Sequence, residues 1–171
     1  MSVDLSWGIP GEDFRQLTER FTNLERSFDD FREPFGDMMG VLEDEARYRF
    51  ASQGAHGTGE KWHKLDTWYA ARKAAKYGTR PILMASGALA RSLTDRKDPN
   101  ALAVIKKLEM ARGSKLQVGK AGEWNLGLLH QLGAPRANLP IRRILALSKR
   151  AQGQISDIFA RWFYRQGEGR I

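Results

Sequence analysis

The stretch from Pro81 to Leu93, PILMASGALARSL, constrains the fold more than any other part of the chain. An apolar trio leads into Ser86-Gly87, and the next residues place Leu89 and Leu93 on one face of a short helix. The Ser86 hydroxyl is placed to accept a hydrogen bond from one of the first free backbone N–H groups of that helix. Pro81 ends the basic segment before it, because its ring fixes φ and removes an N–H. The stretch therefore predicts the point at which helices give way to a sheet.

Two helical patterns precede this stretch. From Glu12, apolar residues at steps of three and four form one stripe, and Pro34 interrupts it by disfavouring helical geometry in the residue before it. A second pattern covers about Pro34–Ser52, with the consecutive acids Glu43, Asp44 and Glu45 on its solvated side. The stripe consists of Phe14, Leu17, Phe21, Leu24, Phe28 and Phe31. It predicts either a core face or a seam to another subunit, since its spacing also fits a heptad.

Alternating patterns follow the stretch. Residues 101–109 and 114–118 alternate apolar with polar side chains and predict an antiparallel hairpin around Ala111-Arg112-Gly113. Residues 141–147, IRRILAL, predict one more strand.

Two further helices are predicted in this half of the chain. Trp124–Leu132 forms a short apolar helix ended by Gly133, and Ser148 caps a final helix that runs to about Gln166. The apolar face of the final helix consists of Ala151, Ile155, Ile158, Phe159, Trp162 and Phe163.

These patterns predict an α+β fold, with N-terminal helices and a long C-terminal helix packed on a small, mainly antiparallel sheet. A length of 171 residues favours a single domain. Within it we expect an extended arm (1–11), an acidic helical hairpin or long broken helix (12–53) and a basic α+β core (60–171). Residues 53–59 contain three glycines and predict a mobile loop, without the GxxxxGK[ST] order of a phosphate loop.

Charge is divided unequally along the chain. Residues 1–60 hold 6 Lys and Arg against 13 Asp and Glu, a net charge of −7, whereas residues 61–171 hold 22 against 7, a net charge of +15. This polarity suits a protein partner, a nucleic acid or head-to-tail contact between copies, and it also fits two solvated faces that differ by chance. No apolar run is long enough to cross a membrane, and the N-terminus lacks the features of a signal peptide. We expect a protein made in the cytoplasm, with no membrane partner.

No pattern indicates catalysis or metal binding. The chain has no cysteine, and the spacing of His56 and His63 matches no zinc motif. His130 lies in a short apolar helix, where a bond to a backbone group is expected. Met84 stands where a GxSxG elbow around Ser86 would need glycine. We therefore expect no enzyme, cofactor or metal; a hydrolase that uses His63 or His130 is a remote alternative.

Aromatic and basic residues are mixed just before the central stretch. Trp62 and Leu65 share one side of a turn, and Asp66 or Thr67 caps a short helix that ends near Lys76. That helix carries Trp68, Tyr69, Arg72, Lys73 and Lys76. The mixture is typical of a nucleic-acid surface. The competing interpretation, which we favour, packs the aromatic residues and Leu65 inward and leaves the lysines in solvent.

The order of several motifs resembles the phage virion morphogenesis family, which contains tail-completion and neck proteins of tailed bacteriophages. These motifs are Trp62-x-x-Leu65 followed by Thr67 and Lys73, then ILMASGALARSL, a hairpin, LLHQLG, and LPIRRILALS before the last helix. The residues that carry the match are Trp62, Leu65, Ser86, Gly87, Leu89, Ser92, His130, Gln131, Gly133 and Pro140. The resemblance runs from about Arg47 to the C-terminus. It departs from the family pattern at Ile141, where alanine is usual, and at Arg143-Ile144, which replace Pro-Phe.

The resemblance implies a structural protein of the virion, at the joint between head and tail. It implies a ring, a hexamer or dodecamer, that contacts other neck and tail proteins such as the connector or stopper and the tail terminator. Since genomic DNA passes this joint, exposed cations are candidates for an interface or for phosphate contacts. The candidates are Arg72, Lys73, Lys76, Arg136, Arg142 and Arg143. The alternative function is a nucleic-acid-binding protein without sequence specificity.

Overall fold

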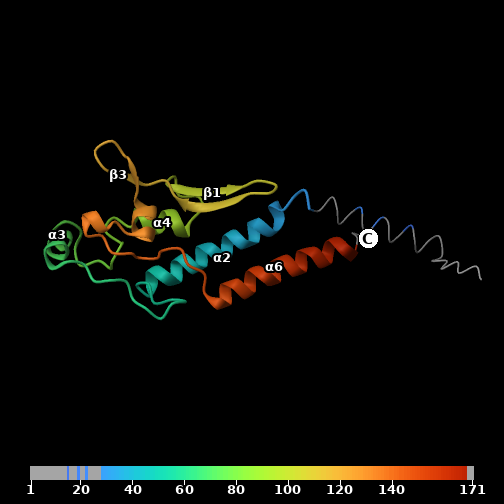
Figure 1. Cartoon of the computed structure of the whole chain (residues 1–171), viewed down its shortest axis with the longest axis horizontal. Coiled ribbons are helices and arrows are strands. Elements are labelled where there is room, and N and C mark those ends of the chain that lie inside the picture. Colours follow the sequence, from blue (N-terminus) through green and yellow to red (C-terminus); the bar gives the residue numbers. More distant parts are fainter. Residues whose placement is uncertain (1–14, 16–18, 20–21, 23–27, 169–171) are drawn as a thin grey trace, which may run out of the picture.

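The protein has an elongated shape, with two long helices under a smaller layer of short helices and strands (Figure 1). The computed structural model describes residues 15, 19, 22 and 28–168, so the predicted arm and most of the first helical stripe lie outside the described residues. The helices are α2 (Arg32–Ala51), α3 (Thr67–Tyr77), α4 (Ala88–Thr94), α5 (Leu126–Leu132) and α6 (Lys149–Glu168), with a 3-10 turn at Pro135–Ala137. The strands are β1 (Ala101–Ile105), β2 (Met110–Ser114), β3 (Gln117–Val118) and β4 (Trp124–Asn125). The predicted α+β class is confirmed.

Helices α2 and α6 run antiparallel (Figure 1). Aromatic rings of α6 pack on Phe35 of α2 and on Phe28 and Phe31, just before α2. The Phe31 ring lies 4.9 Å from the Trp162 ring, centroid to centroid, and the Phe28 ring lies 5.5 Å from that of Phe163. Trp162 is almost fully buried. Aromatic pairs of this kind contribute about 0.5–1.5 kcal/mol each beyond the burial of their area. The apolar face predicted for the last helix is therefore the face that packs on α2.

Two of the three consecutive acids on α2 are buried, which corrects the prediction that all three face solvent. Successive helical residues are about 100° apart, so Glu43 and Glu45 point to nearly opposite sides, and α2 is covered on both. Glu43 accepts hydrogen bonds from the Arg96 guanidinium at 3.0–3.2 Å and from Arg112 at 3.5 Å. Asp44, between them, is exposed and pairs with Arg47.

Glu45 joins α2 to the start of α6. Its carboxylate accepts hydrogen bonds from the backbone N–H and the hydroxyl of Ser148, both at 2.9 Å, and bonds to His56 Nε2 at 2.8 Å. Burial opposes ionisation of Glu45, but the bonds from His56 and Ser148 outweigh it and lower its pKa. The Ser148 hydroxyl also accepts from the Ala151 N–H, which confirms the predicted helix cap.

The Pro81–Leu93 stretch lies at the centre of the upper layer. Its Leu89, Ala90 and Leu93 form one buried cluster with Ala46, Phe50, Trp62 and Ile144. The predicted short helix is α4, which begins at Ala88, and Gly87 precedes it with φ of +77°. The Ser86 hydroxyl accepts a hydrogen bond from the Ala88 N–H at 3.3 Å, as expected of a serine at a helix start. Ser92 is fully buried and donates to or accepts from the Ser114 hydroxyl at 2.8 Å, which ties α4 to β2.

The predicted hairpin exists, but its turn is misplaced. Strands β1 and β2 pair from Ala101↔Ser114 to Ile105↔Met110, so the turn lies at residues 106–109 and Gly113 is inside a strand. The turn has no glycine or proline and is closed by the hydrogen bond from the Lys106 N–H to the Glu109 carbonyl at 2.8 Å, beside an exposed ion pair between the same two side chains. Residues 117–118 belong to a second small sheet, paired with β4.

Residues 141–147 do not form the predicted strand. Among the described strands none pairs with them, and the Gln131 side chain takes that role for two residues. Its carbonyl oxygen accepts from the N–H groups of Ile144 and Leu145 at 2.8 and 3.0 Å, and its amide donates to the Leu145 carbonyl at 2.8 Å. Together with the backbone bond from the Arg142 N–H to the His130 carbonyl at 2.7 Å, Gln131 holds this segment against α5.

The loop at residues 53–59 was predicted to be mobile, but it is held by hydrogen bonds to Arg49 and by contact with Trp62. The Arg49 guanidinium donates to the Gly54 carbonyl at 3.1 Å, and the Gly54 N–H donates to the Arg49 carbonyl at 2.9 Å. Trp62 covers Gly54 so closely that a Cβ there would lie 2.4 Å from the indole ring. The glycine thus permits Trp62 to enter the core.

We expect Gly87→Val to lower the free energy of unfolding by about 1–3 kcal/mol, because a β-branched residue is strained at positive φ. Chemical denaturation measures the effect. Gly153→Ala is the matched control, since Gly153 lies within α6 with open space around its Cα, and it should stabilise by about 0.5–1 kcal/mol. Equal effects of the two substitutions would contradict this role of Gly87.

Gln131→Met should cost about 2–3 kcal/mol of stability, because it removes three hydrogen bonds worth roughly 1 kcal/mol each. Gln154→Met, at an exposed position of α6, is the control and should be neutral. Thermal melting of both variants tests the assignment, and a Gln131 variant as stable as the control would disprove it.

Candidate functional site

An open groove of about 1240 Å³ lies at the α3 end of the molecule. Its lining comes from residues 63–69 and Lys73, from the stretch between Leu83 and Leu89, from α5 and from residues 133–142. Nine large apolar side chains line the groove: Leu65, Trp68, Leu83, Leu89, Leu116, Leu126, Leu132, Leu139 and Ile141.

Helix α3 is attached to the body by an unusual contact. Asp66 caps it by accepting from the Trp68 N–H at 2.9 Å, as predicted. Its one buried residue is Lys73, whose ammonium donates to the carbonyls of Arg80 and Pro81. Burial, together with the nearby Arg80 charge, lowers the Lys73 pKa. The ammonium therefore fixes the turn that follows α3.

The aromatic residues of α3 are exposed, which corrects the prediction that they pack inward. Trp68 is 67% exposed and Tyr69 is 48% exposed, whereas Trp62 is buried and Leu65 is half-buried. The physical reason is that Lys73, with its backbone bonds, occupies the inward face of α3. The Arg72 guanidinium lies over the Trp68 ring, 5.6 Å from its centroid.

Arg142 and His130 lie together in the wall of the groove. Arg142 is 3% exposed and donates to the His63 carbonyl at 3.3 Å. Burial lowers its pKa, while Tyr69 acts in the opposite direction. His130 Nδ1 is buried without a hydrogen-bond partner, contrary to the predicted backbone bond, and burial and the Arg142 charge lower the His130 pKa to about 4. His130 is therefore neutral at pH 7.

These positions change the set of candidate surface cations. Lys73 and Arg142 were predicted contacts for DNA or a partner, but both are buried and bonded to backbone carbonyls, so their charges do not face the surface. Arg72, Lys76, Arg136 and Arg143 are exposed.

The residues that carry the family resemblance converge on this groove. Seven of them line it: Leu65, Ser86, Gly87, Leu89, His130, Gly133 and Pro140. The other three residues do not line the groove but bind the elements around it. Trp62 belongs to the core cluster, Ser92 hydrogen-bonds to Ser114, and Gln131 hydrogen-bonds to residues 144–145. Sequence reasoning missed Leu116, Leu126 and Leu139, because nothing in their local pattern separates a groove from a core. It also missed that the apolar residues next to these motifs, Leu132 and Ile141, would be exposed.

The chemistry of the groove is that of a binding surface. Within the described part of the chain, no three acidic or histidine side chains gather to form a metal site, and no helix is long and apolar enough to span a membrane. The groove offers apolar side chains, a neutral imidazole and the exposed cation Lys64.

A comparison with protein families gives one match. The model of the phage virion morphogenesis family matches residues 12–164, and the chain belongs to this family. Membership indicates a structural, rather than enzymatic, role in the phage virion. No curated protein and no solved structure matches the chain.

The lowered pKa of His130 predicts that the folded protein becomes less stable as the pH falls. Between about pH 6.5 and pH 4 the unfolded chain binds a proton that folded His130 does not, so its contribution is complete above pH 6.5 and is lost as the pH falls through this range. The melting temperature of His130→Leu should depend less on pH here than that of the wild type. His63→Gln, at an exposed position, should keep the wild-type slope. Parallel slopes for all three proteins would contradict the assignment.

Proposed function

We propose that this protein is a structural component of the head–tail joint of a phage, where it forms a ring and helps to join the tail to the DNA-filled capsid. The observation that carries the proposal is the groove, because the family motifs converge on an exposed, mostly apolar surface. Two further parts of the proposal follow from the family resemblance. They are a ring of six or twelve copies, and contacts with the connector or stopper and the tail terminator.

The groove supports a role in protein contacts. Trp68, Tyr69, Leu132 and Ile141 are each about half exposed or more, and Leu128 lies exposed on the same short helix as Leu132. A large exposed apolar surface costs free energy in water and marks an interaction site in soluble proteins. Aromatic residues and arginine are also the side chains enriched at such interfaces.

DNA binding is the alternative function, and one observation favours it. Helix α3 presents Arg72 over Trp68 and Lys76 over Tyr77, a combination suited to phosphates and bases. However, two of the six candidate cations, Lys73 and Arg142, are buried and cannot contribute. We therefore propose DNA contact as a secondary property of a ring through which the genome passes.

Imaging of intact particles tests the principal proposal. Cryo-electron microscopy of the virion neck, with the chain carrying an N-terminal density tag, should place tag density in a ring at the head–tail joint. Particles from a phage that lacks the gene should have filled heads without attached tails. Absence of the protein from purified particles would disprove a structural role at this joint.

A binding assay separates the two functions. If DNA contact is secondary, duplex DNA should bind weakly at about 50 mM salt, and the logarithm of the binding constant should fall with log salt at a slope no steeper than roughly −4 for four cations. Arg72→Glu with Lys76→Glu should reduce that slope, whereas Lys97→Glu with Lys149→Glu is the control of equal charge at other exposed sites. Tight binding that survives about 200 mM salt would favour the alternative.

A further inference from the structure

We propose that residues 12–27 of one copy dock, as an amphipathic helix, in the groove of a second copy, so that copies join head to tail. The inference rests on the ring proposed above, and it names the two surfaces that make the contact.

The first observation concerns the apolar stripe of the N-terminal segment. Its last two members, Phe28 and Phe31, pack on Phe163 and Trp162 of α6. Helix α6 ends at Glu168, and after Tyr164 its sequence, RQGE, offers no apolar side chain. The four earlier members of the stripe are Phe14, Leu17, Phe21 and Leu24. As a helix, these four residues form one apolar stripe, which continues the stripe of Phe28 and Phe31 toward the N-terminus.

The groove has the chemistry and the size for these four residues. Its lining includes Tyr69, Leu132 and Ile141, which are 48%, 63% and 55% exposed. A volume of 1240 Å³ corresponds to about 16 Å of a helix roughly 10 Å across. From Phe14 to Leu24, a helix rises about 15 Å. The volume of the groove is therefore of the same order as that of a helical segment of this length.

Charge favours the same pairing. Residues 1–31 hold seven acids and three arginines, a net charge of −4. Lys64, Arg72, Lys76 and Arg136 are exposed in the groove wall or on the elements that form it, and Asp66 is the one acid that lines it. Opposite charges of this kind set the orientation and partner of a contact.

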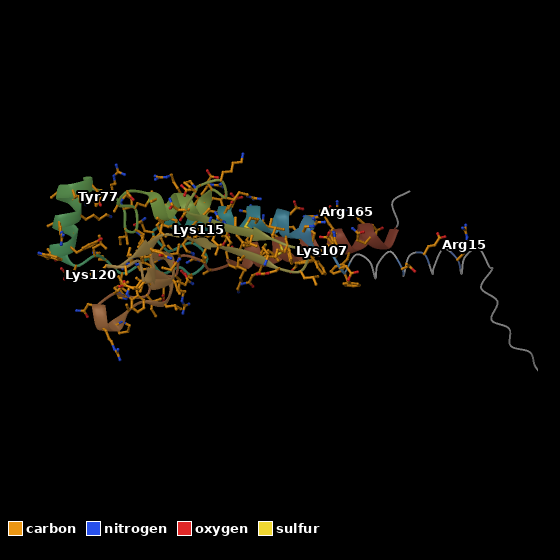
Figure 2. The ribbon with its side chains drawn as sticks, turned by 90° about the horizontal axis from the view of Figure 1, so that it is seen from above. Arg15, Tyr77, Lys107, Lys115, Lys120 and Arg165 are labelled. Carbon is orange, nitrogen blue, oxygen red and sulfur yellow. The ribbon has the colours of Figure 1, made fainter. Side chains whose placement is uncertain are left out.

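The positions of the two surfaces favour a second copy over the same copy. The N-terminal segment enters α2 at the end where Arg165 pairs with Glu33 at 2.8 Å, and the groove lies at the α3 end. Figure 2 shows Arg165 and Tyr77, at the end of α3, well separated along the molecule. Helix α2 alone has 20 residues and is about 30 Å long. Two different patches at opposite ends make a heterologous contact, which closes into a ring when its rotation allows.

A mixing experiment with the full chain tests the proposal. Phe21→Asp places a charge in the apolar stripe of the segment, so that this segment should no longer dock. Leu132→Asp places a charge at an exposed position of the groove, so that this groove should no longer accept a segment. Native mass spectrometry and light scattering should show the wild type as an oligomer and each variant alone as a monomer. Mixed together, they should form a 1:1 dimer and nothing larger, because the intact segment of one variant docks in the intact groove of the other. Leu108→Asp, exposed in the β1–β2 turn, is the control and should remain oligomeric.

Cross-linking provides a second readout. Since the chain has no cysteine, Leu17→Cys in one copy and Tyr69→Cys in another should give a disulfide between copies, and Leu17→Cys with Leu108→Cys should not. Circular dichroism and melting confirm that each variant is folded. A monomeric wild type, variants that remain oligomeric, or a mixture without dimers would each overturn the proposal. Particle imaging decides the role in the virion independently, so the two failures are distinguishable.

Discussion

Two buried carboxylates on one helix hold this structure together. Glu43 faces the upper layer and binds Arg96 and Arg112, whereas Glu45 faces α6 and binds Ser148. Burying a carboxylate is costly unless charged or polar groups surround it, and removal of one partner of a buried pair destabilises by about 3–5 kcal/mol. The partners lie 53–103 residues away in sequence. These contacts therefore fix how the two layers of the fold meet.

The groove depends on a related device, in which long polar side chains bind irregular backbone. Gln131 holds residues 144–145, Lys73 holds residues 80–81, and Arg142 holds residue 63. Buried backbone groups need partners, and these segments have no neighbouring strand to supply them. Because the side chains satisfy the backbone, the surrounding apolar residues are free to line an open surface. The motifs shared with the family thus maintain the shape of the groove and do not perform chemistry.

Sequence patterns predicted the local elements well and their surroundings poorly. The caps at Asp66 and Ser148 and the helix stop at Gly133 are correct, because each depends on neighbouring residues only. Two predictions are wrong: that Glu43 and Glu45 face solvent, and that residues 141–147 form a strand. Both depend on partners that lie elsewhere in the sequence, the arginines that bind Glu43 and the Gln131 side chain. The sequence indicated the residues of the groove only through the order of motifs that resembles the family. The aromatic rim of the groove was predicted to be core, as apolar spacing does not reveal which side is covered.

Glu43 couples α2 to the upper layer, and hydrogen exchange of the Glu43→Gln variant measures this coupling. The substitution leaves the buried Arg112 without its charged partner. We expect faster exchange in α4, β1 and β2, with protection retained in α6, which Glu45 and the aromatic cluster hold separately. Unchanged exchange in the upper layer, or a uniform loss of protection in both layers, would contradict it.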